Sequence, residues 1–194
     1  MLMPRASAVD AARTAQRVLE FATALFAERG FREVSLADVA LAAGVTRGAV
    51  YHHYGSKAKL FAAVAAHLQA RVAEAVVAAA DAAGSSPTDQ LRSGSHAFLD
   101  AITTGDAVRV LLIDAPAVIG WQEWRRLDAQ NSATHLSDAL SSAGVPTDLL
   151  DATTAQLSGA MNEAALWIAQ EDDSTHARVR SHVVLDRLID AYLT

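Results

Sequence analysis

The side chains best suited to bind DNA lie between residues 35 and 57, in the run S-L-A-D-V-A-L-A-A-G-V-T-R-G-A-V-Y-H-H-Y-G-S-K. Arg47 has a planar fork of donors, which can bind guanine O6 and N7 together or neutralise a phosphate. Tyr51 and His53 have the reach for backbone phosphates. A helix that starts at Thr46 would bring its positive dipole end to the duplex together with Arg47. These residue types at this spacing favour recognition of nucleic acid.

A helix that recognises DNA needs a second helix to support it, and the residues before Thr46 predict such a helix. Ser35 is the expected N-cap of a short helix, with Asp38 in the capping-box position. Gly44 ends that helix because glycine readily takes a positive φ, and Thr46 then caps a helix that reaches about Tyr54. A plain corner between two helices explains the glycine and the apolar spacing. It does not explain the polar side chains that project outward.

The run from Phe26 to Leu60 closely resembles the DNA-binding domain of the TetR family of bacterial repressors. The resemblance implies an inward-packed Tyr54 and a homodimer on a palindromic operator. In one respect the chain departs from the family, since the arm before Ala11 has only Arg5 as a cation, which makes minor-groove contacts by an arm doubtful. The DNA contacts implied by position are Ser35, Thr46, Arg47, Gly48, Tyr51, His52, His53 and Lys57.

Charge is distributed unevenly along the chain. The formal net charge is −6, yet residues 1–59 hold eight Lys and Arg against five Asp and Glu, a net of +3, and the remainder carries the acidic excess. A basic head on an acidic body would direct the head to DNA and orient docking. Ordinary scatter in composition is the alternative explanation.

Periodicity predicts an all-α fold of about nine helices, because apolar residues recur at helical spacing and no strand-like alternation appears. For these helices the resemblance implies a helix-turn-helix DNA-binding head at 1–56 and an effector-binding and dimerisation body at 57–194. Beyond the head, Ser56 and Thr88 are expected to cap the next two helices. Further helices are expected at about 106–114, 121–143, 147–170 and 174–193. We find no internal repeat in the sequence.

The last two helices are more apolar than the end helices of a monomer should be. The resemblance implies that they pair with those of a second subunit in a four-helix bundle. Packing onto the chain's own body is the alternative.

The sensor region is expected near residues 113–124, where a proline interrupts a run that contains two tryptophans. Such a break often leaves the mouth of a cavity in a helical body. A mostly apolar lining would suit a small hydrophobic or aromatic effector, although tryptophans in a bundle also serve as plain core. The candidate lining residues are His96, Asp114, Trp121, Trp124, Asn131, His135, Met161 and Trp167.

Several other functions lack support in the sequence. The chain has no cysteine, and it contains no H-E-x-x-H, no G-x-S-x-G and no phosphate-cradling glycine loop, so we expect no enzyme, no metal site and no cofactor. His52 and His53 are adjacent on a helix and point about 100° apart, which does not suit a metal pair. We expect no signal peptide, no membrane span and a cytoplasmic location. A protein-protein adaptor would need an acidic or apolar third helix, which Arg47 contradicts.

Overall fold

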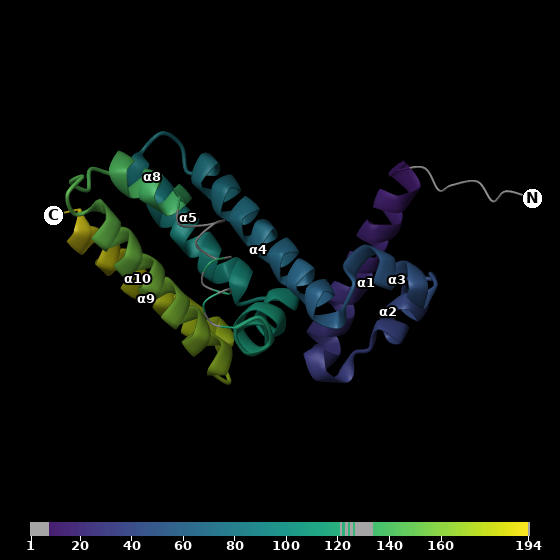
Figure 1. Ribbon diagram of the computed structural model, residues 1–194. Coiled ribbons are helices and arrows are strands. Elements are labelled where there is room, and N and C mark those ends of the chain that lie inside the picture. Colours follow the sequence, from purple (N-terminus) through teal and green to yellow (C-terminus); the bar gives the residue numbers. More distant parts are fainter. Residues whose placement is uncertain (1–7, 121, 123, 125, 127–133, 194) are drawn as a thin grey trace, which may run out of the picture.

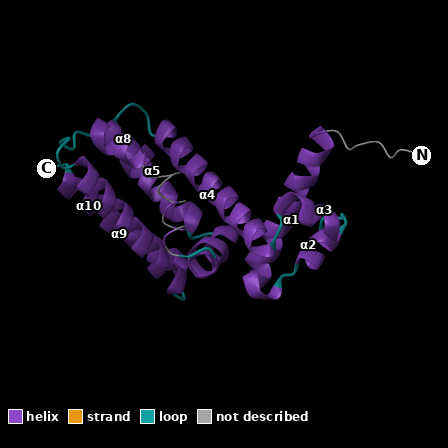
Figure 2. Ribbon diagram, viewed as in Figure 1, coloured by secondary structure: helices purple, strands orange, loops and turns teal. Residues whose placement is uncertain are grey.

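The structure, a computed structural model, describes residues 8–120, 122, 124, 126 and 134–193. Within those residues it consists of α-helices and one π-helical segment, and Figures 1 and 2 show coiled ribbons joined by loops. The predicted all-α class is confirmed. The elements are α1 (Ala8–Glu33), α2 (Leu36–Ala42), α3 (Arg47–Tyr54), α4 (Lys57–Ala82), α5 (Pro87–Ile102), η1 (Val108–Asp114), α6 (Ala115–Val118), α8 (Thr134–Ser142), α9 (Leu150–Gln170) and α10 (Ser174–Tyr192).

Local signals determine where the helices of the head begin and end. Ser35 Oγ accepts the N–H of Asp38 while the Asp38 carboxylate accepts the N–H of Ser35, which completes the predicted capping box. Thr46 and Ser56 cap α3 and α4 as predicted. The kink in α1 falls at Gly30, whose φ of +81° interrupts the helical geometry.

The core of the head is aromatic and aliphatic. Val18, Phe26 and Val39 are fully buried, and Phe26 meets Phe61 of α4 edge-on with ring centroids 5.1 Å apart. By helical spacing, Phe21 is expected on the same apolar face of α1 as Val18 and Phe26. It is instead 40% exposed. The buried face of α1 turns toward Ala22 and Phe26, so Phe21 lies at its rim.

The body is a bundle in which α4 and α5 pack closely and antiparallel, with α8, α9 and α10 completing it (Figure 1). Close approach is possible because Gly94 faces α4, and a Cβ there would already touch Val76 at 3.4 Å. The expected cap of α5 at Thr88 is wrong. Ser86 caps it by accepting the N–H of Asp89, and Pro87 occupies the first turn, where its missing N–H costs nothing.

A second connection between head and body runs through η1. Arg109 Nη1 donates to the carbonyl of Glu28 at 3.1 Å, and the N–H of Phe31 donates to Asp114 Oδ2 at 2.8 Å. Both bonds go to backbone groups that flank the kink at Gly30. The head is therefore fastened to the body by side chains as well as by the continuous helix α4.

By length and composition alone, α4 is long and apolar enough to cross a membrane. Its Phe61, Val64 and Leu68 are nevertheless buried inside the protein. This is the pattern of a core helix that joins two lobes.

Replacing Gly30 by alanine should destabilise the fold by roughly 2–3 kcal/mol, because the new Cβ would combine a left-handed backbone with displacement of a hydrogen-bonded arginine. The Cβ would lie 2.9 Å from Arg109 Nε. Gly84→Ala is the matched control, since Gly84 has a φ of +89° but a Cβ added there would have nothing within 4 Å, and it should cost only about 1 kcal/mol. Chemical unfolding measures both, and equal losses would contradict a role for Arg109.

Candidate nucleic-acid interface

A tight turn between α2 and α3 sets the angle of the exposed helix. Gly44 takes a φ of +62°, and the N–H of Val45 closes the turn by donating to the carbonyl of Ala40 at 3.0 Å. Arg17 of α1 donates through Nε to the carbonyl of Ala43 at 2.9 Å, which satisfies the end of α2. Val50, on the inner face of α3, is fully buried. The outer face of α3 is therefore held on a rigid support.

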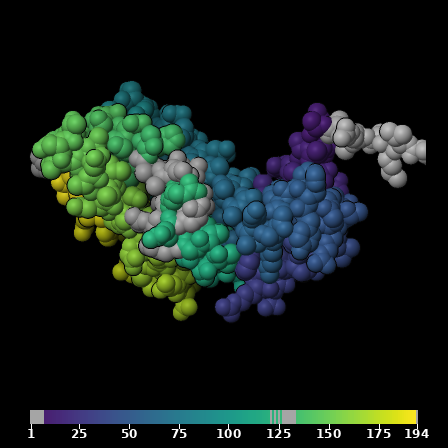
Figure 3. Space-filling view, viewed as in Figure 1, coloured from purple at the N-terminus to yellow at the C-terminus, as the bar shows by residue number. Residues whose placement is uncertain are grey.

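That outer face is polar and belongs to the head, which Figure 3 shows as the purple and blue lobe beside the green and yellow body. Thr46, Arg47, Gly48 and His52 are exposed, and Tyr51 is 46% exposed. The first turn of α3 contains no acid, so the positive end of the helix dipole is unopposed. A surface of this kind can accept phosphates and donate to base edges.

Arg47 does not extend freely from this surface. Its guanidinium carbon lies 5.6 Å from the centroid of the Tyr51 ring, one helical turn away. This cation–π contact reduces the freedom of both side chains before any DNA arrives. His53, half-buried, lies beside His52 with ring centroids 5.4 Å apart.

The predicted contacts Lys57 and Ser35 have partners inside the head. Lys57 Nζ donates to the carbonyl of Arg32 at 3.1 Å and lies 4.4 Å from the Phe31 ring centroid. Ser35 Oγ donates to Asp38 Oδ2 at 2.6 Å, and the hydrogen bonds from Ser35 lower the pKa of Asp38. These two side chains would have to share or leave these partners to reach phosphate.

Tyr54 faces inward, as the resemblance implied. Its hydroxyl donates to the carbonyl of Ala15 at 2.8 Å, and burial raises its pKa. The ring thereby ties the end of α3 to α1. Among the described residues no group of three or more His, Asp or Glu side chains is arranged to hold a metal ion, so His52 and His53 have no third ligand there.

The body contains a cavity of about 210 Å³ between α4, α5, α8 and α9. Its walls are mostly apolar. His135 and Met161 line it, as predicted. The other lining residues, which the sequence alone did not single out, are Val76, Val77, Ala80, Asp81, Gln90, Leu91, Gly94, Ser95, Phe98, Leu136, Ala139 and Ser158.

The remaining predicted effector contacts are scattered. Trp124 is 1% exposed and does not line that cavity, and Asp114 binds the Phe31 N–H at the head–body junction. His96 lies between α5 and α10, while Trp167 borders a groove of about 350 Å³ along α9 and α10. Trp121 and Asn131 lie outside the described residues. Of the six candidates that the structure describes, it brings only His135 and Met161 to the cavity.

The only trace of the cavity in the sequence is a set of small residues, and it is ambiguous. Ala80, Gly94, Ala139 and Ser158 lie on four different segments and leave room where their helices meet. Each of them fits equally well in ordinary helix packing, so their types alone do not distinguish the two uses.

The groove along α9 and α10 is bordered by exposed apolar side chains. Trp167 is 36% exposed, and Arg180 lies 5.7 Å from its ring centroid. On α10, Val179, Val183 and Val184 are each at least half exposed. This is an unusual amount of apolar surface for a helix pair of a monomer.

Two family models match the chain. Residues 18–64 match the model of bacterial regulatory proteins of the tetR family, and residues 88–192 match the tetracyclin repressor-like C-terminal domain. The second match covers more than half of the chain. Together they span both the head and the body.

Individual proteins give the same picture. The chain is 42% identical over 62 residues to the HTH-type transcriptional regulator AcrR of Shigella flexneri, which is 32% of this chain and 29% of that protein. It is 44% identical over 61 residues to the HTH-type transcriptional repressor AcnR of Corynebacterium efficiens, 31% of this chain and 32% of that protein. The chain thus matches about a third of the length of these curated relatives.

Likeness over the full length comes from a solved structure. A TetR-family transcriptional regulator from Pectobacterium atrosepticum superposes with a TM-score of 0.79 at 27% identity. The superposition covers 96% of this chain and 97% of that one. The likeness therefore includes the body as well as the head.

The two tyrosines of α3 should separate stability from recognition. Tyr54→Phe removes the bond to Ala15 and should lower the free energy of unfolding by about 1 kcal/mol while leaving DNA affinity unchanged at a temperature where the head is folded. Tyr51→Phe should change stability by less than about 0.5 kcal/mol and weaken DNA binding. Thermal unfolding and a DNA-binding titration test both, and a loss of DNA binding in Tyr54→Phe alone would contradict the assignment.

Proposed function

The chain belongs to the TetR family of bacterial regulatory proteins, and on that premise we propose that it is a homodimeric repressor that a small molecule releases from a palindromic operator. The observation that carries the proposal is the outer face of α3, where Arg47 and Tyr51 project from the positive end of an acid-free helix. The protein would act in the cytoplasm, where its DNA is.

Recognition would begin at the N-terminal end of α3. Thr46 and Arg47 would enter the major groove first, with Arg47 on guanine or on a phosphate. Gly48 has no side chain to hold the helix away from the groove wall, and an added Cβ would meet only Thr46, at 3.8 Å. Tyr51, His52 and His53 would contact the backbone, with Ser35 and Lys57 at the edges.

A palindromic operator requires two heads, and α9 and α10 would provide the second subunit. Their exposed Trp167, Val179 and Val183 are suited to a four-helix bundle between two copies. The two recognition helices would then be about one turn of DNA apart, roughly 34 Å, or a multiple of that distance.

The effector would occupy the cavity lined by His135 and Met161. Its volume of about 210 Å³ suits a molecule near the size of one aromatic ring, below the range of drug-sized pockets. Among the described residues that line it, only Asp81 carries a fixed charge, so a neutral or cationic ligand is favoured over an anion. Binding there would move α4, which carries the change to the head.

Arg47→Ala should weaken binding to the operator by about 1–3 kcal/mol, which is a loss of roughly five- to 150-fold. If Arg47 contacts a phosphate, the salt dependence should become shallower by about one ion. Arg71→Ala removes an equal charge from α4 in the body and should leave affinity nearly unchanged. Titration of the DNA that flanks the gene, at two salt concentrations, measures both, and equal affinities of the two variants would contradict the proposal.

Benzylamine, benzyl alcohol and benzoate have similar size and different charge, so they test the effector cavity directly. The first two should raise the melting temperature more than benzoate, because Asp81 repels an anion. Asp81→Asn should remove the advantage of benzylamine, whereas Asp138→Asn, an exposed acid of α8 outside the cavity, should keep it. Ala139→Phe fills the cavity and should abolish all three shifts. Equal shifts with benzoate would refute the charge preference.

A further inference from the structure

Two helices that lie far apart in the sequence carry the same pattern, R-x-x-S-H-x-x-L-D. It occupies residues 92–100 of α5 and residues 178–186 of α10. The prediction that the chain has no internal repeat overlooked it, because nine residues with five identities do not stand out in a helical chain. The structure gives the pattern a meaning, since these two segments face each other.

The two histidines meet at the centre of this contact. The rings of His96 and His182 are stacked with centroids 4.2 Å apart and planes 6° from parallel. His96 Nε2 lies 2.8 Å from Asp186 Oδ1, and His182 Nε2 lies 3.1 Å from Asp100 Oδ1. Each imidazole therefore lies within ion-pair distance of an aspartate of the opposite helix, and His96 is also hydrogen-bonded to it.

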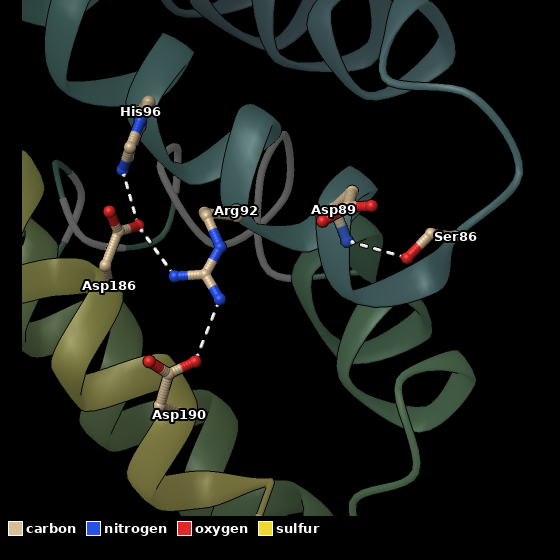
Figure 4. Close-up of polar contacts among 6 residues, drawn as sticks. All are labelled: Ser86, Asp89, Arg92, His96, Asp186 and Asp190. Atoms are coloured by element: carbon tan, nitrogen blue, oxygen red, sulfur yellow. Dashed lines mark hydrogen bonds and ion pairs between the residues drawn. The ribbon is translucent and has the colours of Figure 1, made fainter.

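The arginines complete the same exchange. Arg92 Nη1 lies 3.1 Å from Asp186 Oδ1, and Arg178 Nε lies 3.3 Å from Asp100 Oδ1. Figure 4 shows Arg92 and His96 of α5 converging on Asp186, with Arg92 also reaching Asp190 at 2.8 Å. Antiparallel packing thus pairs the arginine of each motif with the aspartate of the other. We call these seven residues the α5–α10 clasp: Arg92, His96, Asp100, Arg178, His182, Asp186 and Asp190.

This arrangement specifies one register. If α10 slipped by one turn along α5, His96 would face either Arg178 or Asp186 in place of His182, and one Arg–Asp pair would separate. The buried serines and leucines of the motif, Ser95, Ser181, Leu99 and Leu185, would lose their places in the interior as well. Polar residues at a helix interface are well suited to fixing register in this way.

The clasp also limits how many protons it can hold. When both histidines are neutral, the clasp holds two arginines and three aspartates, a net charge of −1. One added proton therefore brings its net charge to zero. A second proton would place two imidazolium ions 4.2 Å apart at a half-buried site, which Coulomb repulsion opposes.

The surroundings of His182 act in the same direction. Burial first, then His96 and Arg178, lower its pKa, against the opposing effect of Asp100 and Asp186. The charged groups that act on the pKa of His182 are thus residues of α5 and α10, and α4 places the neutral Ala75 beside Asp100 and Arg178.

We propose that the α5–α10 clasp is a proton-sensitive latch, which holds α10 in register at neutral pH and loosens when acid puts a charge on both histidines. Its position gives it a regulatory role. One of its helices, α5, supplies Gln90, Leu91 and Ser95 to the cavity in the body, while α10 carries the exposed valines Val179 and Val183 on another face. Loosening the clasp would let the cavity-lining face of α5 and the exposed valine face of α10 move relative to each other.

The test is the dependence of folding stability on pH, measured by urea unfolding from pH 8 to pH 5 at one fixed protein concentration. The pKa of His182 is lowered in the folded state, so below the ordinary histidine value of about 6.5 the unfolded chain takes up a proton that the clasp refuses. Stability should therefore fall as pH falls through this window and level off below the folded pKa. For one refused proton the folding constant drops by up to roughly tenfold per pH unit.

The double variant His96→Gln/His182→Gln removes both imidazole rings and should flatten this part of the profile. His176→Gln, an exposed histidine of α10 outside the clasp, should keep the wild-type slope. If the double variant does not fold, His182→Phe keeps a flat ring in the stack and should also reduce the slope. An unchanged slope in these variants would overturn the proposal.

The register claim has its own test in a charge exchange. Asp100→Arg and Arg178→Asp should each lower stability, and the combined variant should recover at least half of the summed loss because the pair is restored in reverse. Strictly additive losses would show that the two helices are not held by this pairing. Neither measurement requires DNA or an effector, so failure here is separable from failure of the repressor proposal.

Discussion

The aromatic contact between α1 and α4 is the constraint on which the rest of the molecule depends. Phe61 meets both Phe26 and Phe31 edge-on at 5.1 Å, at the point where the head ends and the body begins. This contact fixes the first turns of α4 against the head. Since α4 continues into the body as one helix, a shift of its far end must be transmitted to this cluster or absorbed by bending.

Two polar side chains contact the aromatic cluster at Phe31. Lys57 Nζ lies over the Phe31 ring, and the Asp114 carboxylate accepts the Phe31 N–H. Lys57 is also a predicted phosphate contact, so one short segment connects the DNA-facing edge, the aromatic cluster and η1. A displacement of η1 therefore has a route to the head that does not pass through the length of α4.

The proposed effector cavity and the proposed dimer surface both involve α9. Met161 of this helix lines both the cavity and the apolar groove of α9 and α10. A ligand that pushes on Met161 would be felt at the surface where a second subunit is proposed to bind. Methionine suits such a place, because its flexible side chain adapts to changes in shape. The clasp joins α5, which lines the cavity, to α10, which lines the groove.

The sequence by itself determined the helical class, the caps at Ser35, Thr46 and Ser56, and the exposed polar face of α3. These features depend on residues within one or two turns of each other, so local spacing is enough to predict them. The cavity and the polar junctions were decided only by tertiary structure. Asp114 and Phe31 are 83 residues apart, and His96 and Asp186 are 90 apart. No local pattern reports such a pairing, because a histidine or an aspartate on a helix acquires its role from whichever helix the fold brings against it.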